Sequence, residues 1–502
     1  MSRWDYWLLL VIFFLALGLR LGFVLNGYNI PFDYDQVEDI YLTKRIVVDH
    51  DLPIIGRAIY GNPNIHHGVV FFYFNIIPYV LFGGSALAIV YWICFASSLV
   101  VVVLYFFSYI LFENKFIAFL TALLAAVSYE MVQYSVWISS TTLSVLTVPL
   151  CFLFLSLYLL RGKEFALPLS CVFLGLSIQS QLSFVYLIPV VSLSVIFGKR
   201  SMKYIFLSAL LFLLSVSTMI VTELKLSFGG IRAFMHFSDT FSGTSVSHWE
   251  RLDYYYDDLV KMYSLGLMGG NRRFGEWIFL LVVFVMGLGL LHSSKNNRRG
   301  VYFLFLILFS SAFMLLIGYH RKPWFLVGTV FAVPVTTSYL LGKIKPAFLV
   351  IPILIIVAIF NIRYIAKESL IGTNYFALEK SSLLSSQLEV VDFTYLESAG
   401  EPFAFNATTY PLYHNALWEY HYSWYGMNMY GYVPGWMGGD QVYPYKVLPK
   451  ATENEKMFFV IVDNTYRIPG TYKNRLIQWA DERGKMEKEF ANGFTVQKRS
   501  VL

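Results

Sequence analysis

The sequence predicts an all-α polytopic membrane protein that carries a small α/β domain outside the membrane at its C-terminal end. Of the 502 residues, 57% are hydrophobic and 14% are charged, whereas a soluble domain has roughly 25% charged residues. Apolar runs of roughly 17 to 25 residues, each long enough to cross a hydrocarbon core of about 30 Å as a helix, recur up to about residue 362. We therefore divide the chain into a transmembrane domain, residues 1–363, and an external domain, residues 364–502.

About eleven crossings are predicted from the apolar runs of the first domain. The runs lie at residues 6–25, 86–112, 116–134, 141–160, 165–181, 182–197, 204–221, 277–291, 301–319, 324–341 and 347–362. A short basic leader precedes the first run, but this run is longer than the apolar core of a secretory signal, and no small-residue cleavage site follows it. We therefore interpret it as an uncleaved helix.

The basic residues indicate how the helices are oriented. If the N-terminus is cytoplasmic, nearly every short basic loop falls on the cytoplasmic side, as the positive-inside rule requires. These loops carry Lys115, Arg161, Lys163, Lys199, Arg200, Lys203, Lys295, Arg298, Arg299, Lys343 and Lys345. Orientation in a plasma (inner) membrane thus accounts for the net charge of +6, and no nucleic-acid partner is predicted.

The segment GVVFFYFNIIPYVLF, residues 68–82, is predicted to form juxtamembrane helices at the outer interface rather than a crossing. If this segment were counted as a crossing, every later loop would move to the opposite side of the membrane. The short basic loops would then no longer lie on the cytoplasmic side. This topology places two long loops, residues 26–84 and 222–276, on the extracytoplasmic side together with the C-terminal domain. The unusual polar residues therefore gather on one side of the membrane.

The first external loop opens with the carboxylate-rich stretch PFDYDQVEDIY. One interpretation is structural, because Asp35 and Glu38 match the N-cap and N3 positions of a capping box. The helix that follows would turn an apolar stripe toward the membrane. The stripe consists of Val37, Ile40, Tyr41 and Val48.

The other interpretation of this stretch is chemical. A carboxylate beside low-dielectric lipid can serve as general base for an alcohol or amine nucleophile. Asp33-Tyr34-Asp35 also matches the DxD string of metal- and nucleotide-dependent glycosyltransferases, although no Gly-rich nucleotide-binding domain accompanies it. The spacing alone leaves the structural and chemical interpretations open.

Several landmarks in order resemble the GT-C glycosyltransferases, in particular the protein O-mannosyltransferase and aminoarabinose transferase type. They begin with Arg20, FDYDQVEDIYLTKRI and IHHGVVFFYFNIIPYVLFGGS, and continue with GLSIQSQLSFVYLIP (residues 175–189) and TELKLSFGGIRA (residues 222–233). The resemblance covers residues 1–235 through these landmarks, and beyond them only through the number of helices.

The resemblance implies transfer of a sugar from a polyprenyl-phosphate carrier to a lipid, glycan or protein acceptor on the outer face, with inversion at the anomeric carbon. Asp35 matches the catalytic Asp of the family and would be the general base. Gln36 stands where a neighbouring acid is usual, which leaves Asp33 as a competing candidate. The resembled branch is generally metal-independent, so no metal is predicted, with Mg or Mn at Asp33 and Asp35 as the alternative.

Further site residues follow from the same resemblance. The donor phosphate would be held by His66, His67, Arg321 and Lys322. The segment YSVWISST, residues 134–141, lacks the second external Asp of several members, so Glu130 or Glu223 would substitute for it. The residues expected to contact the acceptor or support the site are Glu38, Asp39, Glu130, Gln181 and Glu223.

Two other functions are compatible with the composition. The first is a flippase or transporter of lipid-linked sugars, but the polar residues crowd one face instead of the bilayer midplane. The second is a catalytically silent relative that binds carrier or acceptor. The sugar, the acceptor and the oligomeric state are not predicted.

The external domain is predicted to contain both strands and helices. MFFVIVD (residues 457–463) is typical of a buried strand, YKNRLIQWADERGK (472–485) of a helix, and EFANGFTVQKR (489–499) of a hairpin. Residues 410–439 concentrate Tyr, Trp and Gly, which suits either the core of the domain or a glycan-binding surface.

Overall fold

The computed structural model describes most of the chain as two compact units. Described are residues 2–59, 62–198, 201–235, 247–292, 295–317, 323–370, 379–452 and 455–501. The helical unit comprises residues 1–23, 50–76 and 90–367, and the sheet unit comprises residues 24–49, 77–89 and 368–502. The protein is thus mostly helical with a small C-terminal sheet domain, as predicted.

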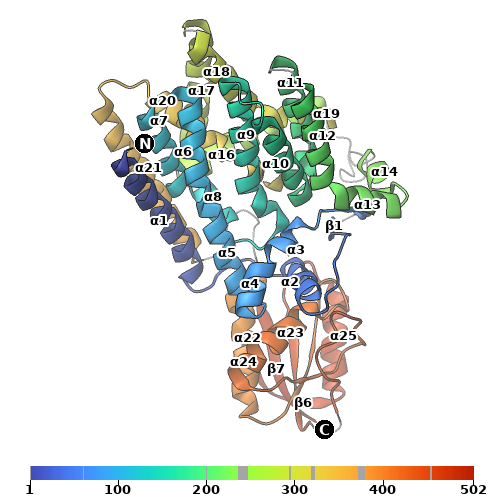
Figure 1. Cartoon of the computed structure of the whole chain (residues 1–502). Coiled ribbons are helices and arrows are strands. Elements are labelled where there is room, and N and C mark those ends of the chain that lie inside the picture. The colour runs from blue at the N-terminus through green and yellow to red at the C-terminus, as the bar shows by residue number, and fades with distance from the viewer. Residues whose placement is uncertain are drawn as a thin grey trace. The chain divides into compact units, whose positions relative to one another are not determined.

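The helical unit contains helices and one short hairpin (Figure 1). Its α-helices are α1 (Arg3–Leu25), α3 (Val70–Phe74), α5 (Ala86–Ser98), α6 (Val100–Phe112), α7 (Lys115–Val127), α8 (Tyr129–Tyr134), α9 (Ser144–Arg161), α10 (Ala166–Ser180), α11 (Leu187–Phe197), α12 (Met202–Ser215), α13 (Ser217–Lys225), α14 (Gly229–Met235), α16 (His248–Leu267), α17 (Arg272–His292), α18 (Lys295–Leu308), α19 (Met314–Ile317), α20 (Ala332–Leu341) and α21 (Val350–Glu368). The hairpin pairs β1 (Ala58–Ile59) with β2 (Asn62–His66). Short 3-10 helices lie at Ser140–Leu143, Leu182–Tyr186, Ser310–Phe313, Pro323–Thr329 and Ala347–Leu349.

Every predicted apolar run is largely helical, and the chain is a multi-pass membrane protein. Within the described ranges, five helices are long and apolar enough to cross a membrane, or six if α12 and α13, which are bent by 57°, form one span. The five are Arg3–Leu25, Ala86–Phe112, Ser140–Arg161, Arg272–His292 and Ala347–Glu368. The count of eleven crossings and the side on which each terminus lies stay predictions.

Small and hydroxyl-bearing residues let α9, α10 and α12 lie side by side (Figure 1). The Ser177 hydroxyl donates to Thr147 Oγ1 at 2.8 Å, which joins α10 to α9. A Cβ on Gly175 would lie 1.8 Å from Ser215 Oγ, so only glycine allows this approach of α10 to α12. Both features are typical of helix packing in a membrane, where the hydrophobic effect does not drive association.

The sheet unit is built on a five-stranded sheet with the order β4-β3-β5-β7-β6. Its strands are β3 (Ala404–Ala407), β4 (Gly435–Trp436), β5 (Met457–Asp463), β6 (Gly484–Ala491) and β7 (Phe494–Val501). Its α-helices are α2 (Tyr34–Val47), α4 (Ile76–Phe82), α22 (Leu384–Ser398), α23 (Ala416–Tyr420), α24 (Met427–Tyr430) and α25 (Gly470–Asp481), with a π-helix at His421–Gly426 and a 3-10 helix at Lys380–Ser382. β3 pairs in parallel with β4 and β5, whereas β7 is antiparallel to β5 and β6.

Both faces of the sheet are covered, which explains the continuous apolar run of β5. Phe459 and Ile461 pack on the same side as α22 and α23, and the alternate residues Phe458, Val460 and Val462 pack on the side of α25. The predicted strand at 457–463 is therefore confirmed. Among the aromatic residues of the 410–439 segment, three belong to this core, namely Trp418, Tyr422 and Trp436.

The end of the chain follows the prediction with one shift. The helix begins at Gly470 and ends at Asp481, earlier than predicted, because Gly484 already starts strand β6. The predicted hairpin is present as β6 and β7, and Gly493 at its turn has a φ of 71°, a conformation that favours glycine.

Candidate functional site

The carboxylate stretch begins helix α2 with a capping box at Asp33. The Asp33 carboxylate accepts a hydrogen bond from the Tyr34 N–H at 2.9 Å, and Gln36 Oε1 accepts one from the Asp33 N–H at 2.8 Å. The prediction that Asp35 and Glu38 form the box is wrong by two residues, because glutamine serves as well as glutamate at N3. Asp35 therefore lies in the first turn of α2, where it is exposed.

The apolar face of α2 packs against protein and not against lipid. Val37, Ile40 and Tyr41 are buried, and the Tyr41 ring meets the ring of Tyr445 edge to face with centroids 5.3 Å apart. Of the predicted membrane-facing stripe only Val48 is exposed. The predicted contact with the membrane is wrong because the C-terminal domain covers this apolar face of α2.

The strand-like segment before α2 is hydrogen-bonded to the same domain. Phe32 N–H donates to Ser382 O at 2.9 Å, and Leu384 N–H donates to Ile30 O at 3.1 Å. Pro31 and Leu383 thereby form an isolated antiparallel bridge. The residues that lead into the carboxylate helix are thus part of the sheet unit.

A buried network also holds the Phe32 carbonyl. The Gln387 side-chain amide donates to Phe32 O at 2.7 Å and to Ser381 O at 2.9 Å. Because both amide protons are used, Gln387 Oε1 must accept, so His421, 2.8 Å away, donates through a protonated Nε2. Burial lowers the pKa of His421 to about 3, which keeps the imidazole neutral. We call Gln387 and His421 the amide clamp.

Asp33 is paired with a cation from far along the chain. Arg467 Nη1 lies 3.2 Å from Asp33 Oδ2. Burial raises the pKa of Asp33 to about 6; the Tyr34 N–H and Arg467 lower it, and the charges of Asp35 and Asp463 raise it. Asp33 is thus helix cap and ion-pair partner, and Asp35 is the more exposed of the two carboxylates.

The other two acids of α2 differ in exposure. Asp39 is buried with 1% of its surface exposed, and Glu38 is half-buried. Of the four acids from residue 33 to residue 39, Asp35 is the one that is exposed.

The two predicted histidines lie at the end of the β1–β2 hairpin in the helical unit. His66 Nδ1 is 2.8 Å from Gly56 O, and the His67 N–H donates to Arg57 O at 3.0 Å. Next to them, the Gly68 N–H donates to Gln179 O at 2.9 Å, which fixes the hairpin to the end of α10. Burial and then the charges of Arg57 and His66 lower the pKa of His67 to about 3. His67 is therefore a neutral hydrogen-bonding group at pH 7.

Arg57 is a cation beside the histidines that sequence reasoning missed. It lies opposite His67 across the hairpin, and its charge acts on His67. The sequence offered no signal for it, because it lies nine positions before His66 and the strands β1 and β2 are too short to show a period. Arg321 and Lys322, the cations predicted to hold the phosphate, lie outside the described residues.

Glu130 is a buried carboxyl group on α8, outside the candidate spans. It accepts hydrogen bonds from the Tyr134 hydroxyl at 2.8 Å and from the Gln133 amide at 2.5 Å. Burial raises its pKa to about 7; Tyr134, Lys261 and Gln133 lower it, and Asp258 raises it. Lys261 and Asp258 both lie on α16, so the neighbouring charges that act on Glu130 come from one helix.

Glu223 and Gln181 have local partners. The Glu223 carboxylate accepts from the Ile231 N–H at 3.0 Å, and a Cβ on Gly230 would lie 2.0 Å from Glu223 Oε1. Glu223 therefore sits against the start of α14. Gln181 is buried and its Oε1 accepts from the Thr141 hydroxyl at 3.4 Å.

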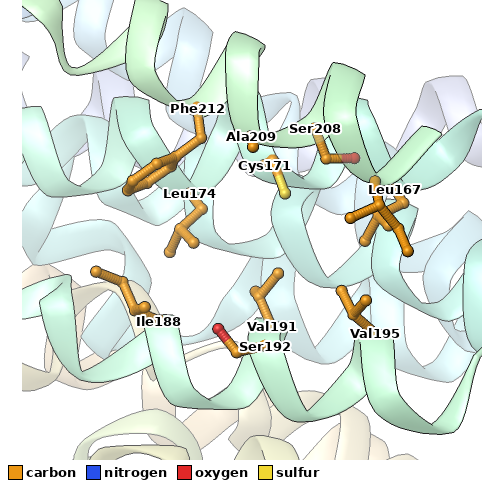
Figure 2. A pocket seen from close by; sticks show the side chains of 11 residues that line it. Leu167, Cys171, Leu174, Ile188, Val191, Ser192, Val195, Ser208, Ala209 and Phe212 are labelled. Carbon is orange, nitrogen blue, oxygen red and sulfur yellow. The ribbon is translucent and has the colours of Figure 1, made fainter. Parts of the chain in front are cut away.

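An apolar cavity of about 190 Å³ lies between α10, α11 and α12 in the helical unit. Figure 2 shows Leu174 and Cys171 on one side and Ile188, Val191 and Val195 on the other. Ser192 and Ser208 are the polar side chains of its lining. The cavity residues on α10, Leu167, Cys171 and Leu174, lie toward the start of this helix, whose other end holds Gly68.

The predicted residues thus fall into two groups. Asp33, Asp35, Glu38 and Asp39 belong to the sheet unit, and the others that are described belong to the helical unit, namely His66, His67, Glu130, Gln181 and Glu223. Across the described ranges, no three side chains of His, Cys, Asp or Glu cluster as metal ligands would.

Comparison with known proteins identifies a family match and a shared fold. The family model of dolichyl-phosphate-mannose-protein mannosyltransferases matches residues 66–222. No curated protein has significant sequence similarity to the chain. A crystal structure of ArnT from Cupriavidus metallidurans in the apo state shares 10% identity over 97% of this chain and 96% of that chain, with a TM-score of 0.55.

A second structure of the same ArnT, bound to undecaprenyl phosphate, shares 11% identity over 98% of this chain and 97% of that chain, with a TM-score of 0.58. AglB from Archaeoglobus fulgidus, an archaeal oligosaccharyltransferase solved with an inhibitory peptide and a dolichol-phosphate, shares 12% identity over 96% and 73% of the two chains, with a TM-score of 0.47. The chain therefore has the fold of the GT-C membrane glycosyltransferases, and the resemblance to their protein mannosyltransferase and ArnT-like members is confirmed.

Proposed function

We propose that the protein is an integral-membrane glycosyltransferase that moves a sugar from a polyprenyl-phosphate-linked donor to an acceptor on the extracytoplasmic face. The observation that carries this proposal is the fold shared with ArnT along nearly the whole of both chains, one structure of which is bound to undecaprenyl phosphate. The match of residues 66–222 to the mannosyltransferase family supports it independently.

Asp35 is the base in this proposal. Its exposed carboxylate takes the proton from an acceptor hydroxyl or amine as that group attacks the anomeric carbon. The bond between the anomeric carbon and the phosphate oxygen breaks on the opposite side, its electron pair leaves with the polyprenyl phosphate, and the configuration inverts. Asp33 supports the helix from its cap position, since its carboxylate already pairs with Arg467.

The departing phosphate needs cations and hydrogen-bond donors. Arg57 supplies a fixed positive charge, and His66 and His67 supply ring nitrogens beside it. Arg321 and Lys322 are proposed to complete the set. Because His67 is neutral, its contribution is a hydrogen bond rather than a charge.

The carrier tail needs an apolar channel that is open to the membrane. The cavity between α10, α11 and α12 has this chemistry and lies on the helix whose end binds the His67–Gly68 segment. Glu130, whose pKa burial raises to about 7, is largely protonated at mildly acidic pH and can then donate a hydrogen bond to donor or acceptor. Glu38, Asp39, Gln181 and Glu223 are proposed as supporting residues.

The sugar and the acceptor can be identified by mass spectrometry of surface glycans and glycolipids from cells with and without the gene. Purified protein in nanodiscs is then given the donor, and release of polyprenyl phosphate is followed. We expect Asp35→Asn to lower transfer roughly 100-fold or more while donor still binds. The matched control is Asp440→Asn, because that carboxylate is 79% exposed in a surface ion pair.

Two outcomes would contradict the proposal. Movement of labelled donor across proteoliposomes without release of polyprenyl phosphate would identify a flippase. Donor binding without turnover in the wild type, when the acceptor found in cells is present, would identify a silent relative.

A further inference from the structure

The two residues that precede helix α2, which we call the carboxylate helix, are held by groups far along the chain. The amide clamp binds the carbonyl of Phe32, and Arg467 binds the carboxylate of Asp33. The Phe32 ring also packs on His421 and Tyr420, with centroid distances of 5.3 and 5.4 Å. Asp35 follows two residues later, in the first turn of α2.

We infer that the C-terminal domain positions the carboxylate helix for reaction, with Gln387, His421 and Arg467 as its positioning residues. The inference rests on the proposed function, in which Asp35 is the base. It assigns a role in the reaction to the C-terminal domain, because these three residues contact Phe32 and Asp33, which lead directly into α2.

Physical arguments favour this role over simple anchoring. An isolated helix of 14 residues, the length of α2, is marginal in water, so its position depends on what it packs against. A base must be held within about 0.5 Å of its productive geometry, and a displacement of about 1 Å can cost roughly 100-fold in rate. Gln387 and His421 are both buried, so water does not compete for the hydrogen bond that holds the Phe32 carbonyl.

The clamp is also specific in its chemistry. Gln387 uses both amide protons and its oxygen, and it is 1% exposed. Replacing its amide would leave Phe32 O and Ser381 O without their donor in a buried place, which costs about 1–3 kcal/mol per group. The smallest change that gives the Phe32 carbonyl a new donor is a local rearrangement of the Phe32 peptide. That rearrangement moves Asp33, the N-cap residue of α2.

The test uses the full chain in nanodiscs with two variants and two matched controls. Gln387→Leu removes the clamp amide, and Gln478→Leu makes the same change at an exposed position of α25. Arg467→Ala removes the ion pair, and Arg475→Ala removes an exposed cation of α25. Amide hydrogen exchange is measured for peptides within residues 34–47, and kcat and KM are measured separately.

We expect both variants to speed exchange in α2 and to lower kcat roughly 10- to 100-fold, with little change in the donor KM. Arg467→Lys should recover part of kcat, and the controls should match the wild type. Should Gln387→Leu fail to fold, the surface variant Arg467→Ala decides alone. Exchange and kcat equal to those of Arg475→Ala would overturn the inference.

The two proposals fail in different ways. If the wild type transfers no sugar, the proposed function falls, and unchanged exchange in α2 would then overturn positioning as well. If the wild type is active and the variants keep full kcat, only the positioning role is lost.

Discussion

Arg467 and Asp33 form an ion pair at 3.2 Å although 434 residues separate them in the chain. Their side chains are 34% and 30% exposed, so the pair itself contributes only about 0–1 kcal/mol to stability. Its importance is geometric, because it joins the domain at the end of the chain to the N-cap of α2.

Phe32→Ala should destabilise the sheet unit strongly. The ring is fully buried against Tyr420 and His421, and deleting a buried Phe typically costs about 3–5 kcal/mol through lost contacts and the cavity left behind. Thermal unfolding in detergent measures the loss. Leu396→Ala, at a residue 71% exposed on α22, is the control and should change stability by about 0.5 kcal/mol or less. Equal effects of the two changes would contradict the packing described.

Gly68→Ala should disrupt the contact between the hairpin and α10. A Cβ there would lie 2.6 Å from Gln179 Cβ and 2.7 Å from Gln179 Cα, so the backbone must move and the Gly68–Gln179 hydrogen bond must break. We expect a loss of about 1–3 kcal/mol in unfolding free energy and a higher donor KM. Gly287→Ala is the control, because it meets open space within α17 and should be neutral or slightly stabilising. Similar melting temperatures for both variants would refute the prediction.

Glu130 should make stability fall as pH rises. Its folded pKa, raised to about 7, exceeds the unfolded value of 4.5, so the folded state holds a proton that the unfolded state loses between these values. Its stabilising contribution is complete below about pH 4.5 and is lost as pH rises through 7. Melting temperatures between pH 4.5 and 8 should therefore fall less steeply in Glu130→Gln than in the wild type. Glu113→Gln, at a side chain 68% exposed, should retain the wild-type slope.

Chelation by EDTA should leave transfer unchanged. The chemistry proposed uses a carboxylate base and a cationic phosphate site, and neither step requires a metal. Activity assays with EDTA, and with Mg or Mn added back, test this expectation. Loss of activity that Mg or Mn restores, together with loss of the metal effect in Asp33→Asn, would show instead that the DxD string binds a metal.

The helices could be predicted from the sequence because a membrane requires long apolar runs, but their breaks could not. The run at 204–221 is bent by 57° between α12 and α13, where no proline signals a break. Ser215 instead turns its hydroxyl back to Phe212 O at 2.7 Å, a bond that often bends helices. The hydrophobic period is determined over a whole apolar run, so it does not reveal a bend caused by a single residue.

The candidate site shows the same limit. Asp33-x-x-Gln36 and Asp35-x-x-Glu38 both fit a capping box, and the sequence cannot choose between two acids that are two residues apart. Asp33 is the N-cap because Gln387 holds the Phe32 carbonyl and His421 packs on the Phe32 ring. Such contacts over hundreds of residues leave no local pattern, which is also why the pairing of Arg467 could not be predicted.

The membership of α2 in the sheet unit has a consequence for biosynthesis. Residues 24–49 leave the ribosome early, yet the partners that complete their fold lie in residues 368–502. The segment therefore remains without these partners while the intervening helices are synthesised. In a protein truncated before the final domain, residues 24–49 would lack their packing partners and would be open to proteases. Loss of the C-terminal end would thus be recognised through an N-terminal segment.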